Sequence, residues 1–278
     1  MTEVHSHFGV TAQDRIGGGA EADIFALPGK RVLRVMKPGA EPGSEQKRRE
    51  LLARLAKHQG DLSFAMPEVL DHGDIAGRLF SVERRITGQS MDVELKGAVK
   101  YRDGLIRNYL QAALDLGQLP IDAPFGELAG PAPITAPDQD GALSAIAHRS
   151  LRAAGLHADA WVLARALPHS ARPGLVHVDY FPGNVMCEGT QITGVIDFGY
   201  ATLAADPRLT AIIGAACLHS RISANASRAD RQVADDWLRA HGLEGFVVPT
   251  NRWLAAFWAF AYADDLSLEI WGRAQLGL

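Results

Sequence analysis

Between residues 11 and 80 the apolar positions come in short runs separated by glycine and polar residues. Two such runs, at 23–27 and 31–36, follow a cluster of three glycines, and two more lie at 67–70 and 79–83. Short apolar runs with turn residues between them are typical of antiparallel strands. The pattern therefore predicts a small antiparallel sheet in the first part of the chain.

One helix is predicted within this strand-rich part. Leu51, Leu52 and Leu55 repeat with helical spacing, and Ser44 is of a residue type that caps helix N-termini. We therefore expect a helix over residues 45–58.

The pattern changes after residue 86, where polar residues and a glycine at 87–90 interrupt it and mostly helical periodicity follows. The clearest later helices are expected at 231–240 and 251–268. A stretch rich in proline, glycine and aspartate at 119–141 is expected to be an irregular connection.

These patterns together predict an α+β protein of two lobes. The N-terminal lobe, residues 1–85, combines a β-sheet with one helix, and the C-terminal lobe, residues 89–278, is mainly helical. The connecting segment is expected near residues 82–88.

Composition narrows the class of protein. The chain of 278 residues is 47% apolar and 22% charged with a net charge of -4, and its Lys and Arg are scattered, so no nucleic-acid or membrane partner is expected. The longest uncharged apolar run, 254–263, is far shorter than the ~20 residues that a membrane helix needs. Cys187 and Cys217 lack metal-binding spacing, so we expect both to be buried in the core of a cytoplasmic protein. A monomer or a homodimer is expected.

Three oxygen-bearing side chains stand beside short apolar segments in the second half of the chain. Asp179 and Asn184 follow the strand-like pair Leu175-Val176, and Asp197 ends another apolar run. A hairpin between them would bring all three together. Phosphoryl transfer needs a carboxylate near the attacking hydroxyl and hard oxygen ligands for Mg²⁺. Each residue alone is also a common turn residue, and it is their joint spacing that favours the catalytic interpretation.

The spacing His-x-Asp-x-x-x-x-Asn over residues 177–184, followed by Asp-Phe-Gly at 197–199, is the signature of kinase-like enzymes. Protein kinases have a lysine where this chain has Phe181, and no Ala-Pro-Glu sequence follows here. With Asp206-Pro207 downstream, the region instead resembles the aminoglycoside phosphotransferase family, which includes antibiotic, choline and homoserine kinases. The resemblance implies a two-lobed protein-kinase-like fold over nearly the whole chain.

The resemblance also implies roles for the motif residues. Asp179 accepts or orients the proton of the acceptor hydroxyl, Asn184 and Asp197 bind the Mg²⁺ that bridges the phosphates of ATP, and His177 is structural. Val178 stands where the family usually has glycine, so a different backbone angle is expected there. Thr210 stands at the position where family members often have an Asp after the Asp-Pro pair, here Asp206-Pro207.

The glycines Gly17, Gly18 and Gly19 are candidates for a loop that covers the ATP phosphates, since glycine lets backbone amides approach an anion closely. They could equally be ordinary turn glycines. A dinucleotide-binding turn is disfavoured because no apolar strand precedes the cluster and no helix follows it.

By the same resemblance, Arg34 takes the place of the phosphate-binding lysine, and Glu50 on the following helix is its acidic partner. Lys37 and Glu45 are the alternatives for these two roles. Both Arg34 and Glu50 could also be solvated surface charges. Glu83 lies in the segment 80–88, which resembles the hinge that holds adenine.

The phosphate acceptor is the least determined feature. A cationic aminoglycoside would be held by acidic side chains of the C-terminal lobe, although solvated helix faces explain these candidates as well. The candidates are Asp235, Asp236, Asp264, Asp265 and Glu269. The aromatic residues at 253, 257, 258, 260 and 262 are expected to be core.

The leading hypothesis is therefore an ATP-dependent kinase of a small-molecule hydroxyl, with an aminoglycoside as first choice of acceptor and antibiotic resistance as one possible role. A catalytically silent ATP-binding module and a kinase of choline, homoserine or another small alcohol are the alternatives. A protein kinase ranks last.

Overall fold

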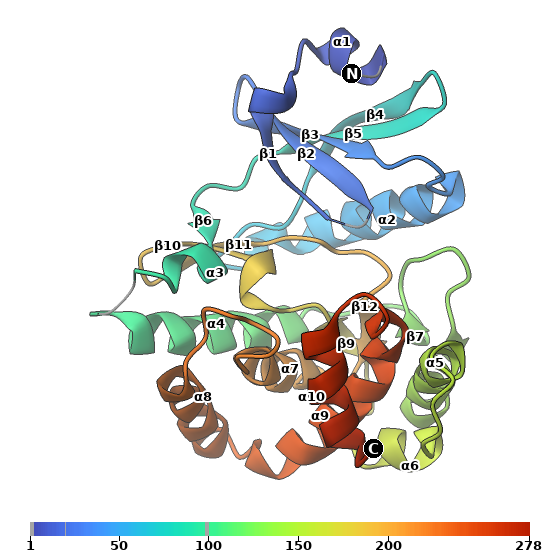
Figure 1. Ribbon diagram of the computed structural model, residues 1–278, viewed down its shortest axis with the longest axis vertical. Coiled ribbons are helices and arrows are strands. Elements are labelled where there is room, and N and C mark those ends of the chain that lie inside the picture. Colours follow the sequence, from blue (N-terminus) through green and yellow to red (C-terminus); the bar gives the residue numbers. More distant parts are fainter. Residues whose placement is uncertain (1–2, 20, 98–99) are drawn as a thin grey trace.

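The computed structural model describes residues 3–19, 21–97 and 100–278. Figure 1 shows two lobes, with a β-sheet and α1 and α2 above and a mainly helical part below. This α+β architecture with a small antiparallel sheet confirms the predicted fold class.

The N-terminal lobe is built on one antiparallel sheet of five strands in the order β1-β2-β3-β5-β4. One core cluster covers a face of this sheet with Phe25, Leu33, Val35 and Phe80, and Val4 of α1 packs into it. The elements are α1 (Glu3–Phe8), η1 (Ala12–Asp14), β1 (Arg15–Gly18), β2 (Ala22–Leu27), β3 (Arg31–Met36), α2 (Pro42–Leu55), η2 (Ala56–Asp61), β4 (Val69–Ile75) and β5 (Arg78–Arg84).

Helix α2 joins the two lobes. Its Leu51, Leu52 and Leu55 belong to a core cluster made mostly of residues of the C-terminal lobe. The helix begins earlier than the predicted residue 45, because Pro42 occupies its first turn and Glu41 is the N-cap. Proline suits that position, since it has no amide hydrogen to satisfy and its φ is already helical. The expected cap at Ser44 is therefore wrong.

The C-terminal lobe places helices around two small sheets, β11-β10-β6 and β8-β7-β12-β9. Its first elements are β6 (Gln89–Ser90), α3 (Met91–Glu94), α4 (Arg102–Gly117), β7 (Phe125–Glu127), β8 (Thr135–Ala136), α5 (Gln139–Ala153), α6 (Ala160–Arg165), β9 (Gly174–His177), η3 (Pro182–Asn184), β10 (Val185–Glu188), β11 (Gln191–Val195) and β12 (Thr202–Ala205). The last are α7 (Leu209–Cys217), α8 (Arg228–Ala240), η4 (Glu244–Phe246), α9 (Val247–Phe257), η5 (Trp258–Ala261) and α10 (Leu266–Leu276).

Two expectations for this lobe are corrected. The predicted helix at 251–268 is three elements, α9, η5 and α10, because the Asp265 side chain accepts the Leu268 amide and so caps a new helix. The stretch 119–141 is not wholly irregular, because β7 and β8 within it extend the four-stranded sheet.

The segment at 85–88 lies between the two sheets. The N-terminal sheet ends with β5 at Arg84, and β6 already pairs with β10 of the C-terminal lobe. Cys187 and Cys217 are both buried and free, as expected of core residues. Within the described part of the chain, no helix combines the length and apolar character needed to cross a membrane.

Candidate active site

The loop after β9 holds Asp179 in a rigid setting. Tyr180 beside it is fully buried and stacks on Tyr109 of α4, with ring centroids 4.8 Å apart. Each hydroxyl donates to the other residue's backbone carbonyl, Tyr109 Oη to Tyr180 O at 2.6 Å and Tyr180 Oη to Tyr109 O at 2.8 Å. These reciprocal bonds fix the backbone next to Asp179.

Hydrogen bonds connect Asp179, Asn184 and Ile196, the residue before Asp197. The Asn184 side chain donates from Nδ2 to the Asp179 carbonyl at 3.0 Å, and the Ile196 amide donates to the Asn184 carbonyl at 2.9 Å. His177 donates from Nε2 to the Ile196 carbonyl at 2.9 Å. Burial lowers the pKa of His177, which favours the neutral ring. Asp179, Asn184 and the residue before Asp197 are therefore held in one network.

Asp197 has an unusual backbone conformation. Its φ of 67° lies in the left-handed region, which non-glycine residues rarely adopt and which is often associated with functional sites. The following Phe198 is fully buried, with its ring 4.9 Å from that of His177. The anchored Phe198 leaves the Asp197 side chain exposed.

The carboxyl group of Asp179 has a perturbed pKa. The pKa is raised to about 6, mainly by burial and with smaller contributions from the negative charges of Asp197 and Glu21. A hydrogen bond from the Trp258 indole Nε1 to Asp179 Oδ1, 3.0 Å long, acts in the opposite direction. A carboxyl group whose pKa is raised toward neutrality is suited to exchange a proton with an acceptor hydroxyl.

Arg34 lies at the centre of a buried ion-pair cluster. Its guanidinium donates from Nη1 to Glu45 Oε2 and from Nη2 to Glu21 Oε2, both at 2.9 Å. Arg34 and Glu45 are each only 5% exposed. The predicted acidic partner, Glu50, is wrong: its side chain is exposed and accepts a bond from Gln46.

Helix geometry explains this correction. Glu45 and Arg48 lie on the same face of α2 as the core leucines Leu52 and Leu55, at the spacing i, i+3, i+7 and i+10. Glu50 follows Glu45 by five residues, which turns it about 140° around the helix, toward solvent. The apolar periodicity of the helix therefore contained the signal that favours Glu45.

Glu83 is also committed to an ion pair that the sequence did not reveal. Arg48 donates to Glu83 from Nη1 at 2.8 Å and from Nη2 at 3.2 Å, and Ser81 Oγ donates to the same carboxylate at 2.8 Å. Burial raises the pKa of Glu83, but the Arg48 charge and hydrogen bonds outweigh it and lower the pKa overall. Because its side chain is buried and paired, Glu83 does not offer a free carboxylate to a nucleotide.

Gly17 and Gly18 are the last residues of β1, and Gly19 follows them directly in the connection to β2. Gly18 has a φ of 155°, and a Cβ there would lie 2.7 Å from Arg15 Nη2 and 2.9 Å from Asp23 Oδ1. Arg15 and Asp23 pair across the hairpin at 2.8 Å. Gly19 donates its amide to Ala22 at 3.0 Å, while Gly17 is free of close contacts at its Cβ position. A side chain at Gly18 would therefore disrupt the hairpin.

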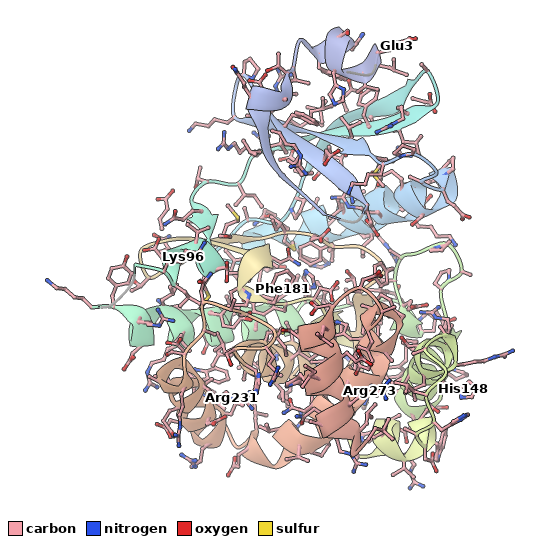
Figure 2. The ribbon with its side chains drawn as sticks, in the orientation of Figure 1. Glu3, Lys96, His148, Phe181, Arg231 and Arg273 are labelled. Atoms are coloured by element: carbon pink, nitrogen blue, oxygen red, sulfur yellow. The ribbon has the colours of Figure 1, made fainter. Side chains whose placement is uncertain are left out.

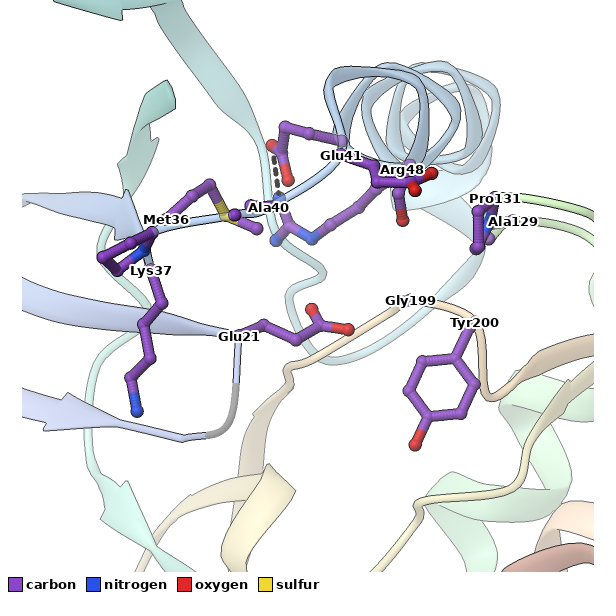
Figure 3. Close-up of a pocket in the computed structure, with 15 residues that line it drawn as sticks. Glu21, Met36, Lys37, Ala40, Glu41, Arg48, Ala129, Pro131, Gly199 and Tyr200 are labelled. Atoms are coloured by element: carbon purple, nitrogen blue, oxygen red, sulfur yellow. Dashed lines mark ion pairs between the residues drawn. The ribbon is translucent and has the colours of Figure 1, made fainter. Parts of the chain in front are cut away.

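A cavity of about 360 Å³ lies between the lobes beside this cluster. Figure 3 shows Glu21 pointing into it, with Lys37 on the N-terminal side and Tyr200 on the C-terminal side. Ala129 and Gly199 also line its C-terminal wall, whereas Asp179 does not line it. The cavity thus adjoins the Arg34 cluster rather than enclosing the motif carboxylates.

Val178 and Thr210, the two departures from the family pattern, are both buried. Val178 does not adopt the left-handed conformation, and its side chain joins the core. The Thr210 hydroxyl accepts the His177 amide at 3.1 Å and donates to the Leu175 carbonyl at 3.4 Å. Thr210 therefore fastens the strand before Asp179 to α7.

Most of the acidic candidates for a cationic substrate have other partners. Asp235, Asp236 and Glu269 pair with arginines on their own helices, and Asp265 caps α10. Two of these arginines are labelled in Figure 2, Arg231 on α8 and Arg273 on α10. Asp264 is exposed. The expectation that these residues form solvated helix faces agrees with these contacts.

The aromatic residues of the C-terminal helices are mostly core, as predicted, with Phe260 41% exposed as the exception. Trp258 was expected to have only this role. Its contact with Asp179 was missed, because the two residues are far apart in the sequence and no motif joins them.

The fold and this site together define a two-lobed small-molecule kinase. The model of a family described as the phosphotransferase enzyme family matches residues 13–206. The chain belongs to this family, which confirms the resemblance drawn from the motifs, and it is accordingly an enzyme that transfers phosphate to a hydroxyl group.

Solved structures similar to this chain are aminoglycoside phosphotransferases. A gentamicin complex of APH(2'')-IIa has a TM-score of 0.65 at 18% identity, covering 99% of this chain and 95% of that one. ADP-bound APH(2'')-Ib has a TM-score of 0.61 at 16% identity, covering 99% and 97%. APH(3'')-Id from Streptomyces rimosus has a TM-score of 0.56 at 16% identity, covering 86% and 91%. No curated protein sequence matches the chain.

Proposed function

We propose that the protein transfers the γ-phosphate of ATP to a hydroxyl group of a small molecule, with Asp179 as the residue that orients the hydroxyl and accepts its proton. The observation that carries this proposal is the hydrogen-bond network in which Asn184 binds the Asp179 carbonyl and Ile196 binds the Asn184 carbonyl. Little covalent chemistry is required of the protein in this reaction, so positioning of oxygen-bearing groups is its main contribution.

Arg34 is proposed to bind the ATP phosphates. Its guanidinium is held by buried Glu45, which keeps the cation at the edge of the interlobe cleft. Glu21, whose side chain is 45% exposed, is the second partner of Arg34. An exposed carboxylate can leave more readily than a buried one, so we infer that a phosphate group takes the place of Glu21 when ATP binds. The turn containing Gly17, Gly18 and Gly19 would cover the phosphates.

Asn184 and Asp197 fit a Mg²⁺ ion by their chemistry. The Nδ2 group of Asn184 is committed to the Asp179 carbonyl, which leaves its Oδ1 oxygen for a metal, and Asp197 presents an exposed carboxylate. The described residues contain no cluster of three or more His, Cys, Asp or Glu that could enclose a metal. That suits Mg²⁺, which usually takes one or two protein oxygens together with substrate phosphates. When bound, the ion would neutralise charge on the transferring phosphate.

The acceptor class is proposed from the structural neighbours, among which the gentamicin and streptomycin complexes of APH(2'')-IIa appear. We propose an aminoglycoside as the first acceptor to test, and choline, homoserine and other small alcohols as the next. The two buried, free cysteines support a reducing compartment, and we propose a cytoplasmic location.

The test is acceptor-dependent release of ADP by the purified protein with Mg²⁺ and ATP, or GTP in parallel. Asp179→Ala should abolish turnover while ATP binding, followed by calorimetry, is retained. The matched control is Asp61→Ala, which removes an exposed carboxylate at the end of η2 and should leave the rate unchanged. Normal turnover in Asp179→Ala would show that the assignment is wrong, and ATP binding without turnover across all acceptors would favour the silent binding module.

A further inference from the structure

A side chain from the C-terminal part of the chain reaches the motif carboxylate. Trp258 begins η5, immediately after α9, and its indole Nε1 donates to Asp179 Oδ1 at 3.0 Å. The Trp258 side chain is buried, with only 6% of the residue exposed. A buried indole N–H needs an acceptor, and a hydrogen bond to an ionised carboxylate is stronger than one to a neutral group.

The segment that carries Trp258 is fixed from two sides. The Ser150 hydroxyl of α5 donates to the Phe257 carbonyl at 2.5 Å and accepts the Phe260 amide at 3.3 Å, so it bonds the chain on either side of Trp258. On the other side, the Trp258 ring packs against Trp271 of α10 with centroids 5.9 Å apart. The indole therefore has little freedom to turn away from Asp179.

The position of α10 depends on a close approach at Gly272. A Cβ at this glycine would lie 1.7 Å from the Tyr262 hydroxyl oxygen, so any side chain there would push the helix outward. The same hydroxyl donates to the Ala255 carbonyl of α9 at 2.6 Å. Packing among α9, η5 and α10 thus determines where Trp258 lies.

We propose that Trp258 is a positioning residue of the phosphotransferase, holding Asp179 Oδ1 so that the second carboxylate oxygen faces the acceptor hydroxyl. The inference rests on the proposed function of Asp179. The outer torsion of an aspartate side chain is broad, so an unrestrained carboxylate samples many orientations. A fixed donor on one oxygen restricts that rotation before the acceptor binds, which is how orientation contributes to rate.

The kinetic test compares Trp258→Phe with Trp253→Phe. Phenylalanine keeps an aromatic ring at position 258 and removes the N–H group. Trp253 is a matched control, because it is a buried tryptophan of α9 whose Nε1 donates to the Leu143 carbonyl at 3.1 Å. We expect kcat to fall about 10- to 100-fold in Trp258→Phe, with KM for ATP within about twofold of the wild type. Trp253→Phe should keep kcat within about threefold.

A spectroscopic test examines the contact without turnover and without altering Trp258. The chain has five tryptophans, so a protein labelled with ¹⁵N-tryptophan gives five indole N–H signals. The Trp258 signal is assigned by its loss in Trp258→Phe. In metal-free Asp179→Ala the same signal should shift upfield and exchange faster with solvent, while the Trp253 signal stays in place.

The outcomes separate the two proposals. An unmoved Trp258 signal in Asp179→Ala would overturn the inference, as would equal losses of kcat in the two phenylalanine variants, since these would indicate packing alone. If the wild-type protein shows no acceptor-dependent ADP release, the proposed function is wrong, and the positioning role fails with it. The NMR result would still show whether Trp258 contacts Asp179.

Discussion

Replacing Asp179 with asparagine should stabilise the folded protein while abolishing phosphate transfer. Asparagine has nearly the same shape and keeps an oxygen that can accept the Trp258 indole bond. It removes the negative charge that burial, Asp197 and Glu21 all disfavour. The substitution therefore relieves a cost that the ionised Asp179 carboxylate imposes on the stability of the fold.

The magnitude follows from the pKa of Asp179. Its value rises from 3.8 to about 6 in the folded protein, and one pKa unit corresponds to about 1.4 kcal/mol. The ionised carboxylate thus lowers the free energy of unfolding by about 3 kcal/mol at neutral pH. Between pH 4 and 6 the folded state binds more protons than the unfolded state, so this cost grows as pH rises through that window.

Urea unfolding of the nucleotide-free protein in EDTA, followed by tryptophan fluorescence, measures the effect. At pH 7 Asp179→Asn should be more stable than the wild type by about 3 kcal/mol, and the difference should shrink as pH falls toward 4. Asp236→Asn is the control: Arg239 and Gln232 hold the pKa of exposed Asp236 below its usual value, so its loss should bring no stabilisation.

The reasoning would be refuted by an Asp179→Asn protein that is no more stable than the wild type at pH 7. A stabilisation that does not change between pH 4 and 7 would also refute it, because it would not arise from ionisation of the carboxylate.

Two further predictions concern the cluster beside the cleft and the packing of the C-terminal lobe. Glu45→Gln should lower kcat/KM for ATP by at least about tenfold in initial-rate assays, since the Glu45 charge orients Arg34, the cation proposed to bind the phosphates. Glu50→Gln, which changes an exposed residue, should leave kcat/KM unchanged, and equal effects in the two variants would contradict the assigned pair. Gly117→Ala should lower the free energy of unfolding by at least about 2 kcal/mol in urea titrations, because the new Cβ would lie 1.9 Å from the Pro207 carbonyl oxygen. Gly43 lies in α2 with open space around it, so Gly43→Ala should instead raise the free energy of unfolding by up to about 1 kcal/mol. Similar losses of stability in both variants would argue against the overlap at residue 117.

The family and the proposed motif residues could be predicted from the sequence alone. Asp179, Asn184 and Asp197 lie within one short stretch, and their spacing along a loop and a hairpin is a local property that survives in any fold containing it. The antiparallel sheet of the first lobe was predictable for the same reason, since alternation and turn residues are read within a few positions.

Local sequence patterns were less informative where the rotational phase or the boundaries of a helix determined which residues meet. The acidic partner of Arg34 had to be chosen between the two glutamates of α2, and only Glu45 lies on the helix face that reaches the guanidinium. The start of α10 likewise depended on its capping by Asp265, a contact that competes with simple continuation of the apolar periodicity.

Contacts between segments that are distant in the sequence could be found only in the tertiary structure. The Arg48–Glu83 pair joins a helix to a strand of the sheet, and Trp258 bonds to Asp179, which lies 79 residues earlier in the chain. Such contacts depend on how whole helices pack, and packing is set by shape complementarity summed over many side chains rather than by any spacing along the chain. The motif therefore predicts which groups react, and the packing of the lobes determines which neighbours hold them in place.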